Sequence, residues 1–218
     1  MKNPVGRPKT LDRKKLINIA FEEYWLKGFN NVTLSSIANI AKISRPGIYK
    51  EFKDEDGLKC EALKKYTNAL KNNVTKQYIK SNDIRTLICH FYSTIGIPQN
   101  KKYFRGIRHA SSINIPKGSK GCFYEKAKIV KYLLSEKTVN EINDFEQHRK
   151  NEFIIYIKKM QNNGKITKSF KSDVIYEYIS ATLSMAQNLE LNEMNKFKIK
   201  SIVDKALSCI LSQKIILN

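Results

Sequence analysis

The sequence predicts an all-α protein in which an N-terminal three-helix helix-turn-helix domain is joined by a long helix to a larger helical domain. Only nine Gly and five Pro occur in 218 residues, too few for the turns of a many-stranded sandwich or barrel. Apolar residues instead recur at helical spacing along most of the chain. With 41% hydrophobic and 10% aromatic residues, the chain has enough apolar surface to fold.

Three short helices are expected at the N-terminal end. The first runs through residues 16–24 and stops after Lys27-Gly28, where a basic last turn precedes a glycine. Thr33 is the expected N-cap of a second helix over residues 34–41, and Ser44 caps a third helix that begins Arg45-Pro46. Proline is tolerated there because the first N–H groups of a helix have no intrahelical partner.

Longer helices follow. Asp54, Glu55 and Asp56 place carboxylates at the start of a fourth helix, which runs towards Ile79. Residues 98–121 hold two prolines and three glycines and are expected to form a short helix between loops. Further helices are expected over residues 83–97, 122–134, 138–161 and 174–189, and from Asn192 to about 210.

The charge points to an acidic partner. Forty Lys and Arg against twenty Asp and Glu give a formal charge of +20, which repels the folded chain from itself unless something acidic binds it. Nucleic acid is the first candidate. Compositional bias is the competing explanation, because lysine is abundant throughout the sequence, so the position of the basic residues must decide.

Several other classes of protein are disfavoured. The longest apolar runs resemble residues 153–157 and are too short to span a membrane, and the first residues lack the apolar core of a secretory signal, so a cytoplasmic location is expected. The four Cys and three His are dispersed, so neither a metal site nor a disulfide framework is predicted. Without a phosphate-binding glycine loop or a catalytic triad in context, the sequence predicts neither an enzyme nor a cofactor.

A helix, a turn and a helix at residues 33–52 match the helix-turn-helix spacing, which alone is weak evidence. The residue string is more specific and resembles, without a gap, the N-terminal domain of TetR-family transcriptional regulators. The resemblance covers residues 11–58, about a quarter of the chain. It rests on Leu16-Ile17-Asn18-Ile19-Ala20-Phe21-Glu22-Glu23-Tyr24, Lys27-Gly28-Phe29, Val32-Thr33-Leu34-Ser35-Ser36-Ile37-Ala38, Ile43-Ser44, Ile48-Tyr49 and Phe52.

The resemblance implies a DNA-binding surface. Thr33 would place its hydroxyl and nearby N–H groups against a DNA phosphate, although a simple helix cap explains it equally well. Arg45 would pair with guanine in the major groove, and Tyr49 would bond a phosphate through its hydroxyl. Ile48 and Phe52 would be core residues. The implied recognition-helix surface comprises Ser44, Arg45, Pro46, Gly47, Tyr49 and Lys50.

Two positions depart from the family pattern. Lys42 stands where glycine is usual in the turn, and a left-handed lysine would cost about 1 kcal/mol unless a phosphate contact offsets it. Glu55 stands where lysine is usual at the start of the fourth helix, which puts that phosphate contact in doubt and leaves Lys53 as the nearest substitute. Arg7 and Lys9 belong to a basic arm that either enters the minor groove or is a solvated tail.

The resemblance also implies two domains, residues 1–53 for DNA binding and 54–218 for effector binding and dimerisation. Two apolar stripes on the last two helices are expected to pair with a second copy, with a self-contained core as the alternative. The expected dimer interface comprises Ile175, Tyr178, Ile179, Ala186, Ile199, Ile202, Val203, Ala206 and Ile210. Aromatics at helical spacing are more often core than ligand site, and the expected effector pocket comprises Phe91, Tyr92, Phe104, Cys122, Phe123, Phe153, Tyr156 and Met185.

Two features of this larger domain stay open. Cys122 starts a helix, where a lowered pKa would suit a sensor of oxidants or electrophiles, but an inert buried cysteine is commoner. Basic residues around the loop would suit an anionic effector, although a solvated loop is the simpler interpretation. They are Lys101, Lys102, Arg105, Arg108, Lys117 and Lys120.

The function expected from these observations is a sequence-specific regulator of transcription. It would be a repressor that binds a palindromic DNA operator as a homodimer and is released by an unidentified small-molecule effector. The alternative is a constitutive or sequence-indifferent nucleic-acid-binding protein of the nucleoid type, without an effector. Overall charge favours the alternative, and the localised motif favours the regulator.

Overall fold

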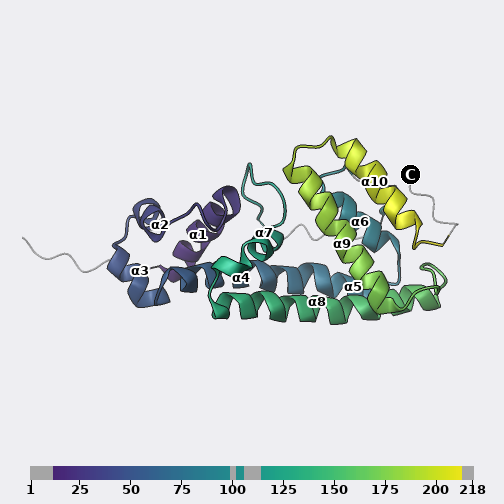
Figure 1. Cartoon of the computed structure of the whole chain (residues 1–218), viewed down its shortest axis with the longest axis horizontal. Helices are drawn as coiled ribbons and strands as arrows, with labels where there is room; N and C mark the ends of the chain where they lie inside the picture. Colours follow the sequence, from purple (N-terminus) through teal and green to yellow (C-terminus); the bar gives the residue numbers. More distant parts are fainter. Residues whose placement is uncertain (1–11, 99–101, 106–113, 213–218) are drawn as a thin grey trace, which may run out of the picture.

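The structure of the chain, a computed structural model, describes residues 12–98, 102–105 and 114–212. In the described residues every regular element of secondary structure is a helix, and the one β-type contact is an isolated bridge between Ile166 and Leu211. The all-α class predicted from the sequence is confirmed. The helix-turn-helix lies at one end of an elongated molecule, and α6, α9 and α10 gather at the other (Figure 1).

The three predicted N-terminal helices are present as α1 (Arg13–Lys27), α2 (Leu34–Ala41) and α3 (Arg45–Phe52). The first begins three residues earlier than the apolar stripe, because the side chain of Asp12 accepts a hydrogen bond from Lys15 N–H and caps the helix. Thr33 caps α2 and Ser44 caps α3, each through its hydroxyl, as expected. The turns of this domain are therefore built by its own polar residues.

A long rod runs from the helix-turn-helix to the far end of the molecule (Figure 1). It consists of α4 (Glu55–Leu70), the π-helical turn η1 (Lys71–Thr75) and α5 (Lys76–Lys80). The predicted helix towards Ile79 is confirmed in extent, but the π-turn was not foreseen. α8 (Glu136–Asn162) packs alongside α4, η1 and α5. The rod thereby connects both ends of the molecule.

The remaining helices differ from expectation mainly at their ends. α6 (Arg85–Thr94) is shorter than the predicted 83–97, because Gly96 adopts a φ of 64° just after it. The segment expected at 122–134 is divided into α7 (Phe123–Ile129) and the 3₁₀ turn η2 (Lys131–Leu133). Between residues 98 and 121 the described residues form turns, and the short helix predicted there stays a prediction, because residues 99–101 and 106–113 lie outside the described residues. α9 (Ser172–Leu191) and α10 (Lys196–Ser208) confirm the last two.

Two hydrophobic clusters form the interior. One contains residues of α5, α6, α8, α9 and α10. The other joins the helix-turn-helix to α4, α7 and the first half of α8. Gly57 belongs to this junction, because a Cβ at that position would lie 2.0 Å from the carbonyl oxygen of Phe52. The predicted boundary between residues 53 and 54 crosses this second cluster, and the division into two domains stays a prediction.

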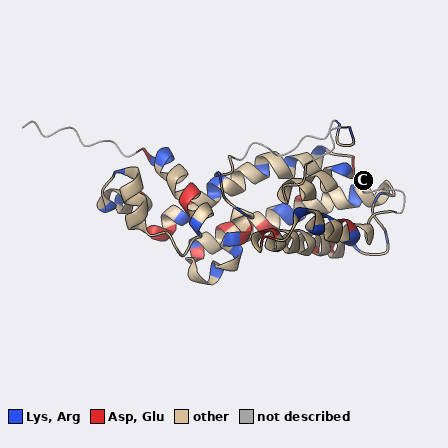
Figure 2. Ribbon diagram, turned by 90° about the horizontal axis from the view of Figure 1, so that it is seen from above, with Lys and Arg blue, Asp and Glu red and all other residues tan. Residues whose placement is uncertain are grey.

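Charge is distributed widely over the molecule. Lys and Arg occur along helices at both ends of the ribbon, with Asp and Glu among them (Figure 2). Net charge therefore does not by itself mark one face as the binding surface. None of the helices in the described part of the chain has the length and apolar character to cross a membrane.

Candidate DNA-binding surface and effector cavity

The second and third helices present one polar surface. Thr33, Ser44, Arg45 and Tyr49 are exposed there, and Tyr49 has 42% of its surface accessible. Pro46 and Lys50 are also exposed, and Gly47 is half-buried. Ile48 and Phe52 point into the core, as predicted. The same short helix is thus anchored by its apolar face and leaves its polar face open.

The basic side chains of this surface have no competing protein partners. No hydrogen bond or ion pair within the described residues involves the side-chain nitrogens of Lys42, Arg45, Lys50 or Lys53. An exposed cation without an internal carboxylate partner remains available to a phosphate or a base edge. The expected arm residues Arg7 and Lys9 lie outside the described residues.

Both departures from the family pattern have structural consequences. Lys42 caps the end of α2 in the left-handed conformation, with φ 54° and ψ 46°, so the strain expected of a non-glycine residue is present. The carboxylate of Glu55 accepts a hydrogen bond from Leu34 N–H at 3.3 Å and pairs with Lys59 at 3.0 Å. An internal anion therefore occupies the N-terminus of α2, beside Thr33.

A cavity of about 180 Å³ lies between the helices of the larger part. Its walls come from the rod, α6, α7, α8 and α9, and Trp25 of α1 also contributes. Most of the lining is apolar or aromatic, as in many small-molecule sites. Trp25 and Tyr66 also belong to the core cluster of the helix-turn-helix. One wall of the cavity is therefore part of the helix-turn-helix end of the molecule.

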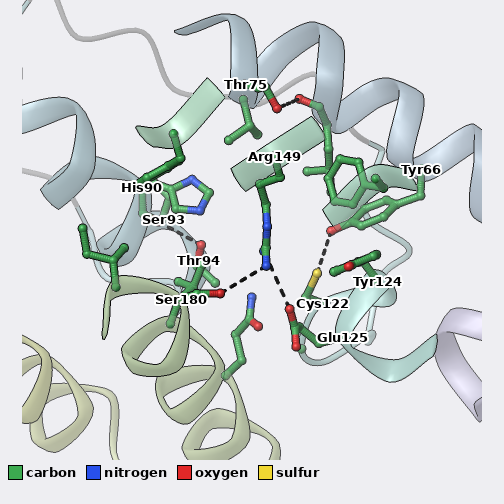
Figure 3. Close-up of a pocket in the computed structure, with 18 of the residues that line it drawn as sticks. Tyr66, Thr75, His90, Ser93, Thr94, Cys122, Tyr124, Glu125, Arg149 and Ser180 are labelled. Atoms are coloured by element: carbon green, nitrogen blue, oxygen red, sulfur yellow. Dashed lines mark hydrogen bonds and ion pairs between the residues drawn. The ribbon is translucent and has the colours of Figure 1, made fainter. Parts of the chain in front are cut away.

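Arg149 dominates the polar side of the cavity (Figure 3). Its Nη2 donates to both carboxylate oxygens of Glu146 at 2.9 Å and to Ser180 Oγ at 3.2 Å. Its Nη1 lies 3.8 Å from Glu125 Oε1. Burial alone would lower the pKa of Arg149, but the neighbouring tyrosine and glutamate groups raise it above its ordinary value. The guanidinium therefore stays charged.

Glu146 is held ionised by the cluster that it forms with Arg149, Tyr124 and Tyr176. Burial alone would raise the pKa of Glu146, but the charge of Arg149 and the donated hydrogen bonds lower it to about 2. Two of those bonds come from Tyr124 and Tyr176, whose hydroxyls lie 2.6 and 2.7 Å from its oxygens. The cluster ties α7, α8 and α9 together around the cavity.

The predicted pocket residues are only partly those that line the cavity. Cys122 and Phe153 line it. Met185 is exposed on the outer side of α9, which corrects its assignment. The other predicted residues do not line the cavity, because they pack into the hydrophobic core between helices. They are Phe91, Tyr92, Phe104, Phe123 and Tyr156.

The residues that sequence reasoning missed are mostly polar. Arg149 sits on the inward stripe of α8 between Phe145 and Phe153, four residues from each. A charged residue in the middle of an apolar stripe is the signal that would have found it. Of the basic residues expected around the loop, Lys101 and Arg108 lie outside the described residues, and the other four do not line the cavity.

Cys122 is the N-cap of α7 and lines the cavity, as its position suggested. Its sulfur lies 3.3 Å from the hydroxyl of Tyr66 (Figure 3). Burial raises the pKa of the Cys122 thiol, the opposite of the lowered pKa that an oxidant sensor requires. The structure favours the inert interpretation of this cysteine.

The expected dimer residues need correction. Tyr178 and Ala206 are half-buried and joined by a hydrogen bond from the Tyr178 hydroxyl to the Ala206 carbonyl, and Ile202 is 38% exposed. The others lie in the core of a single chain, because α6 and α8 cover the stripes that were expected to need a second copy. They are Ile175, Ile179, Ala186, Ile199, Val203 and Ile210.

Comparisons with known proteins agree with this arrangement. Residues 16–59 match the family described as bacterial regulatory proteins, tetR family, and no curated protein matches the sequence. A TetR-family transcriptional regulator from Agrobacterium tumefaciens is similar in structure, with a TM-score of 0.74 at 13% identity over 91% of this chain and 97% of that one.

Two further solved structures are similar over nearly their whole length. NemR of E. coli in its reduced form has a TM-score of 0.71 at 12% identity, over 93% of this chain and 99% of that one. A regulator from Saccharomonospora viridis in complex with choline has a TM-score of 0.68 at 14% identity, over 92% and 98%. At such identities the likeness shows the fold, and the family model matches the N-terminal segment alone. The N-terminal segment of the chain is therefore similar to the tetR family of bacterial regulatory proteins, and the chain as a whole has the fold of solved TetR-family regulators.

Proposed function

We propose that this protein is a repressor that binds a palindromic operator as a homodimer and is released by a small molecule bound in the cavity beside Arg149. The observation that supports the proposal is that the cavity and the core of the helix-turn-helix share two residues. Trp25 of α1 and Tyr66 of α4 both line the cavity, and both pack in the core of the helix-turn-helix. A molecule that fills the cavity therefore contacts the DNA-binding end directly.

The contacts around Trp25 supply a route for this coupling. Its ring NH donates to the Gly121 carbonyl at 3.1 Å, and Lys126 Nζ donates to the Trp25 carbonyl at 2.7 Å. These bonds fasten α1 to the segment that carries Cys122 and α7. Because α1 also packs against α4, movement of α7 on ligand binding would shift α1 and α4 together.

For the dimer we propose an outer face, defined as Val174, Ala181, Met185 and Ile202. These residues project from α9 and α10 away from the core, and all are exposed. A two-fold pairing of this face would hold two recognition helices in a fixed relation, and a spacing of about 34 Å suits successive major grooves. Cytoplasmic location follows from this function and belongs to the same proposal.

DNA binding is tested by a pair of substitutions on α3. Arg45→Ala should relax base preference at one operator position by about 1–3 kcal/mol, whereas Tyr49→Phe should weaken binding to every duplex by the loss of one phosphate contact. Duplexes selected from a random pool supply the operator, and titrations against operator and scrambled DNA measure both effects. Unchanged affinity in both variants would exclude α3 as the recognition helix.

A constitutive, sequence-indifferent binder remains the second candidate, and one observation favours it. Lys and Arg occur on helices at both ends of the ribbon (Figure 2), and charge spread in this way binds any nucleic acid. Competition decides between the two functions. Excess unrelated duplex should displace a nucleoid-type protein from labelled operator but leave a sequence-specific regulator bound.

A further inference from the structure

Three residues that line the cavity carry buried polar atoms that the described part of the protein does not satisfy. Within the described residues, the hydroxyl of Tyr78, Nε of Arg149 and Oε1 of Gln187 are buried without a hydrogen-bond partner, and all three residues line the cavity. Tyr78 is 1% exposed and Gln187 is 6% exposed. Unsatisfied buried polar groups are rare and costly, so their gathering around one cavity points to a missing partner.

These atoms define the hydrogen bonds that the partner makes. Burial raises the pKa of Tyr78 well above its ordinary value, so its hydroxyl keeps its proton and can donate. Nε of Arg149 carries a hydrogen and is also a donor, whereas Oε1 of Gln187 accepts. The partner must therefore offer at least one acceptor and one donor.

The charges around the cavity are already balanced. Among the residues of the Arg, Lys, Asp and Glu types, Arg149 and Glu125 line the cavity. Arg149 is paired with Glu146, and Lys128 lies 3.5 Å from Glu125 and 3.8 Å from Glu146. Two cations thus face two carboxylates. A ligand with a full charge would bring an unpaired charge into a buried site, which is strongly unfavourable.

The size and lining restrict the ligand further. A cavity of about 180 Å³ is slightly larger than an engineered apolar cavity of about 150 Å³ that binds benzene. Aromatic rings surround it, including Trp25, Tyr66, Phe145 and Phe153, and such rings pack well against a flat ring. One substituted ring fits this space better than a fused polycyclic molecule.

We propose that the ligand of this cavity is an uncharged single-ring aromatic molecule whose substituent both accepts and donates a hydrogen bond, as an aryl carboxamide does. Tyr78 and Arg149 donate to its acceptor, and Gln187 accepts from its donor. The inference rests on the proposed function in taking this cavity as the effector site, and it names the chemical class of the effector.

Three probes of nearly identical shape test the charge. Benzamide is neutral, benzoate is an anion and benzamidinium is a cation, and calorimetry on the full chain measures the affinity of each. Benzamide should bind at least tenfold more tightly than either ion. An equal or higher affinity for benzoate or benzamidinium would overturn the proposal, and so would the absence of benzamide binding at millimolar concentration.

Two substitutions test the hydrogen bonds. Tyr78→Phe should lower the affinity for benzamide about 2- to 12-fold, the usual range for one hydrogen bond, without destabilising the free protein, because that hydroxyl has no protein partner. Tyr24→Phe is the matched control. Its hydroxyl is also buried and unpartnered within the described residues, but Tyr24 does not line the cavity, so benzamide affinity should stay unchanged.

Gln187→Leu provides a second and independent test. It should weaken benzamide but leave acetophenone unaffected, because acetophenone offers an acceptor and no donor, whereas Tyr78→Phe should weaken both. If Tyr78→Phe does not fold, the Gln187→Leu comparison decides. If Gln187→Leu weakens the binding of benzamide and acetophenone equally, or weakens neither, the assigned roles are contradicted.

Release of DNA separates this inference from the proposed function. Benzamide that binds without weakening operator affinity would contradict the effector role but support the ligand class. Operator release by benzoate, with benzamide inactive, would support the effector role and overturn the class. Operator release by benzamide, reduced in Tyr78→Phe and not in Tyr24→Phe, supports both.

Discussion

Lys42 combines a strained backbone with an exposed positive charge. Its left-handed backbone, with φ 54°, costs about 1 kcal/mol in a residue with a Cβ, and its ammonium lies on the proposed DNA-binding surface. We therefore expect Lys42→Gly to stabilise the fold by up to about 1 kcal/mol and to weaken DNA binding. Urea unfolding and fluorescence anisotropy on labelled operator measure the two effects.

A second substitution at the same position separates strain from charge. Asparagine tolerates the left-handed region better than most residues but carries no charge, so Lys42→Asn should lose as much DNA affinity as Lys42→Gly. In both variants the salt dependence of binding should become shallower by about one counterion. Unaltered salt dependence would show that Lys42 does not contact phosphate.

Glu55 places a negative charge where DNA is expected to place another. Its carboxylate accepts from Leu34 N–H at the start of α2, beside the exposed cap residue Thr33. We expect Glu55→Gln to increase affinity for all duplexes, and Glu55→Lys to increase it further with a steeper salt dependence. Glu51→Gln, an exposed α3 carboxylate that pairs with Arg13, is the control. Weaker binding by Glu55→Gln would mean that its cap on α2 matters more than its charge.

At the scale of helices, the Glu146 cluster should control stability in acid. The pKa of Glu146 is about 2 in the folded chain, against about 4.3 in an unfolded one. Because the folded value is lower, the carboxylate contributes stability that is fully present above about pH 4.5 and is lost as the pH falls towards 2. Thermal midpoints should decline over that window.

Glu146→Gln tests the assignment. The variant should be less stable at neutral pH, because Arg149 loses its closest carboxylate, and its thermal midpoint should decline less steeply between about pH 4.5 and 2. Glu177→Gln removes a more exposed carboxylate, one that pairs with Lys150, and should leave the slope unchanged. If the thermal midpoint of Glu146→Gln falls as steeply in acid as that of the parent protein, groups other than Glu146 cause the loss of stability.

The sequence predicts the positions of helices well, because caps and apolar periodicity are local. Asp12 and the π-turn η1 are two features that these local patterns did not predict. The apolar stripe starts after the cap that begins α1, and the helical pattern of residues 55–80 gives no sign of an i→i+5 turn at Lys71–Thr75. Such details depend on what packs against the helix, here α8.

The candidate sites show the same division. The predicted DNA-binding residues follow from local spacing, and Thr33, Ser44, Arg45 and Tyr49 are exposed at α2 and α3, but their contact with DNA stays a prediction. The cavity could not be located from sequence, because its residues come from six separate helices and α1. The predicted dimer residues on the last two helices were wrong for a related reason. An apolar stripe such as Ile199 and Val203 does not reveal whether it packs against another helix of the same chain or against a second chain.

At the scale of the whole molecule, the dimer is the main prediction. Met185→Glu combined with Ile202→Glu should give folded monomers, because both side chains are exposed on the outer face of a single chain. Light scattering measures the mass, and circular dichroism checks the fold. Operator affinity should fall, because the two recognition helices would no longer be linked.

The control is another exposed isoleucine. Ile155 lies on α8 and is 50% exposed, but it is not part of the proposed outer face, so Ile155→Glu should remain a dimer. If the double variant keeps the mass of the parent dimer, the interface lies elsewhere on the molecule.

Trp25 is the single tryptophan among the 218 residues, and it is both a cavity residue and a core residue of the DNA-binding end. Its indole emission therefore originates from one known place, buried against Tyr66 and Phe123. An occupant of the cavity would quench or shift that emission, and so would displacement of α1. The unmodified protein therefore carries its own optical reporter, which would follow both the proposed filling of the cavity and the proposed release of DNA in real time without an attached dye.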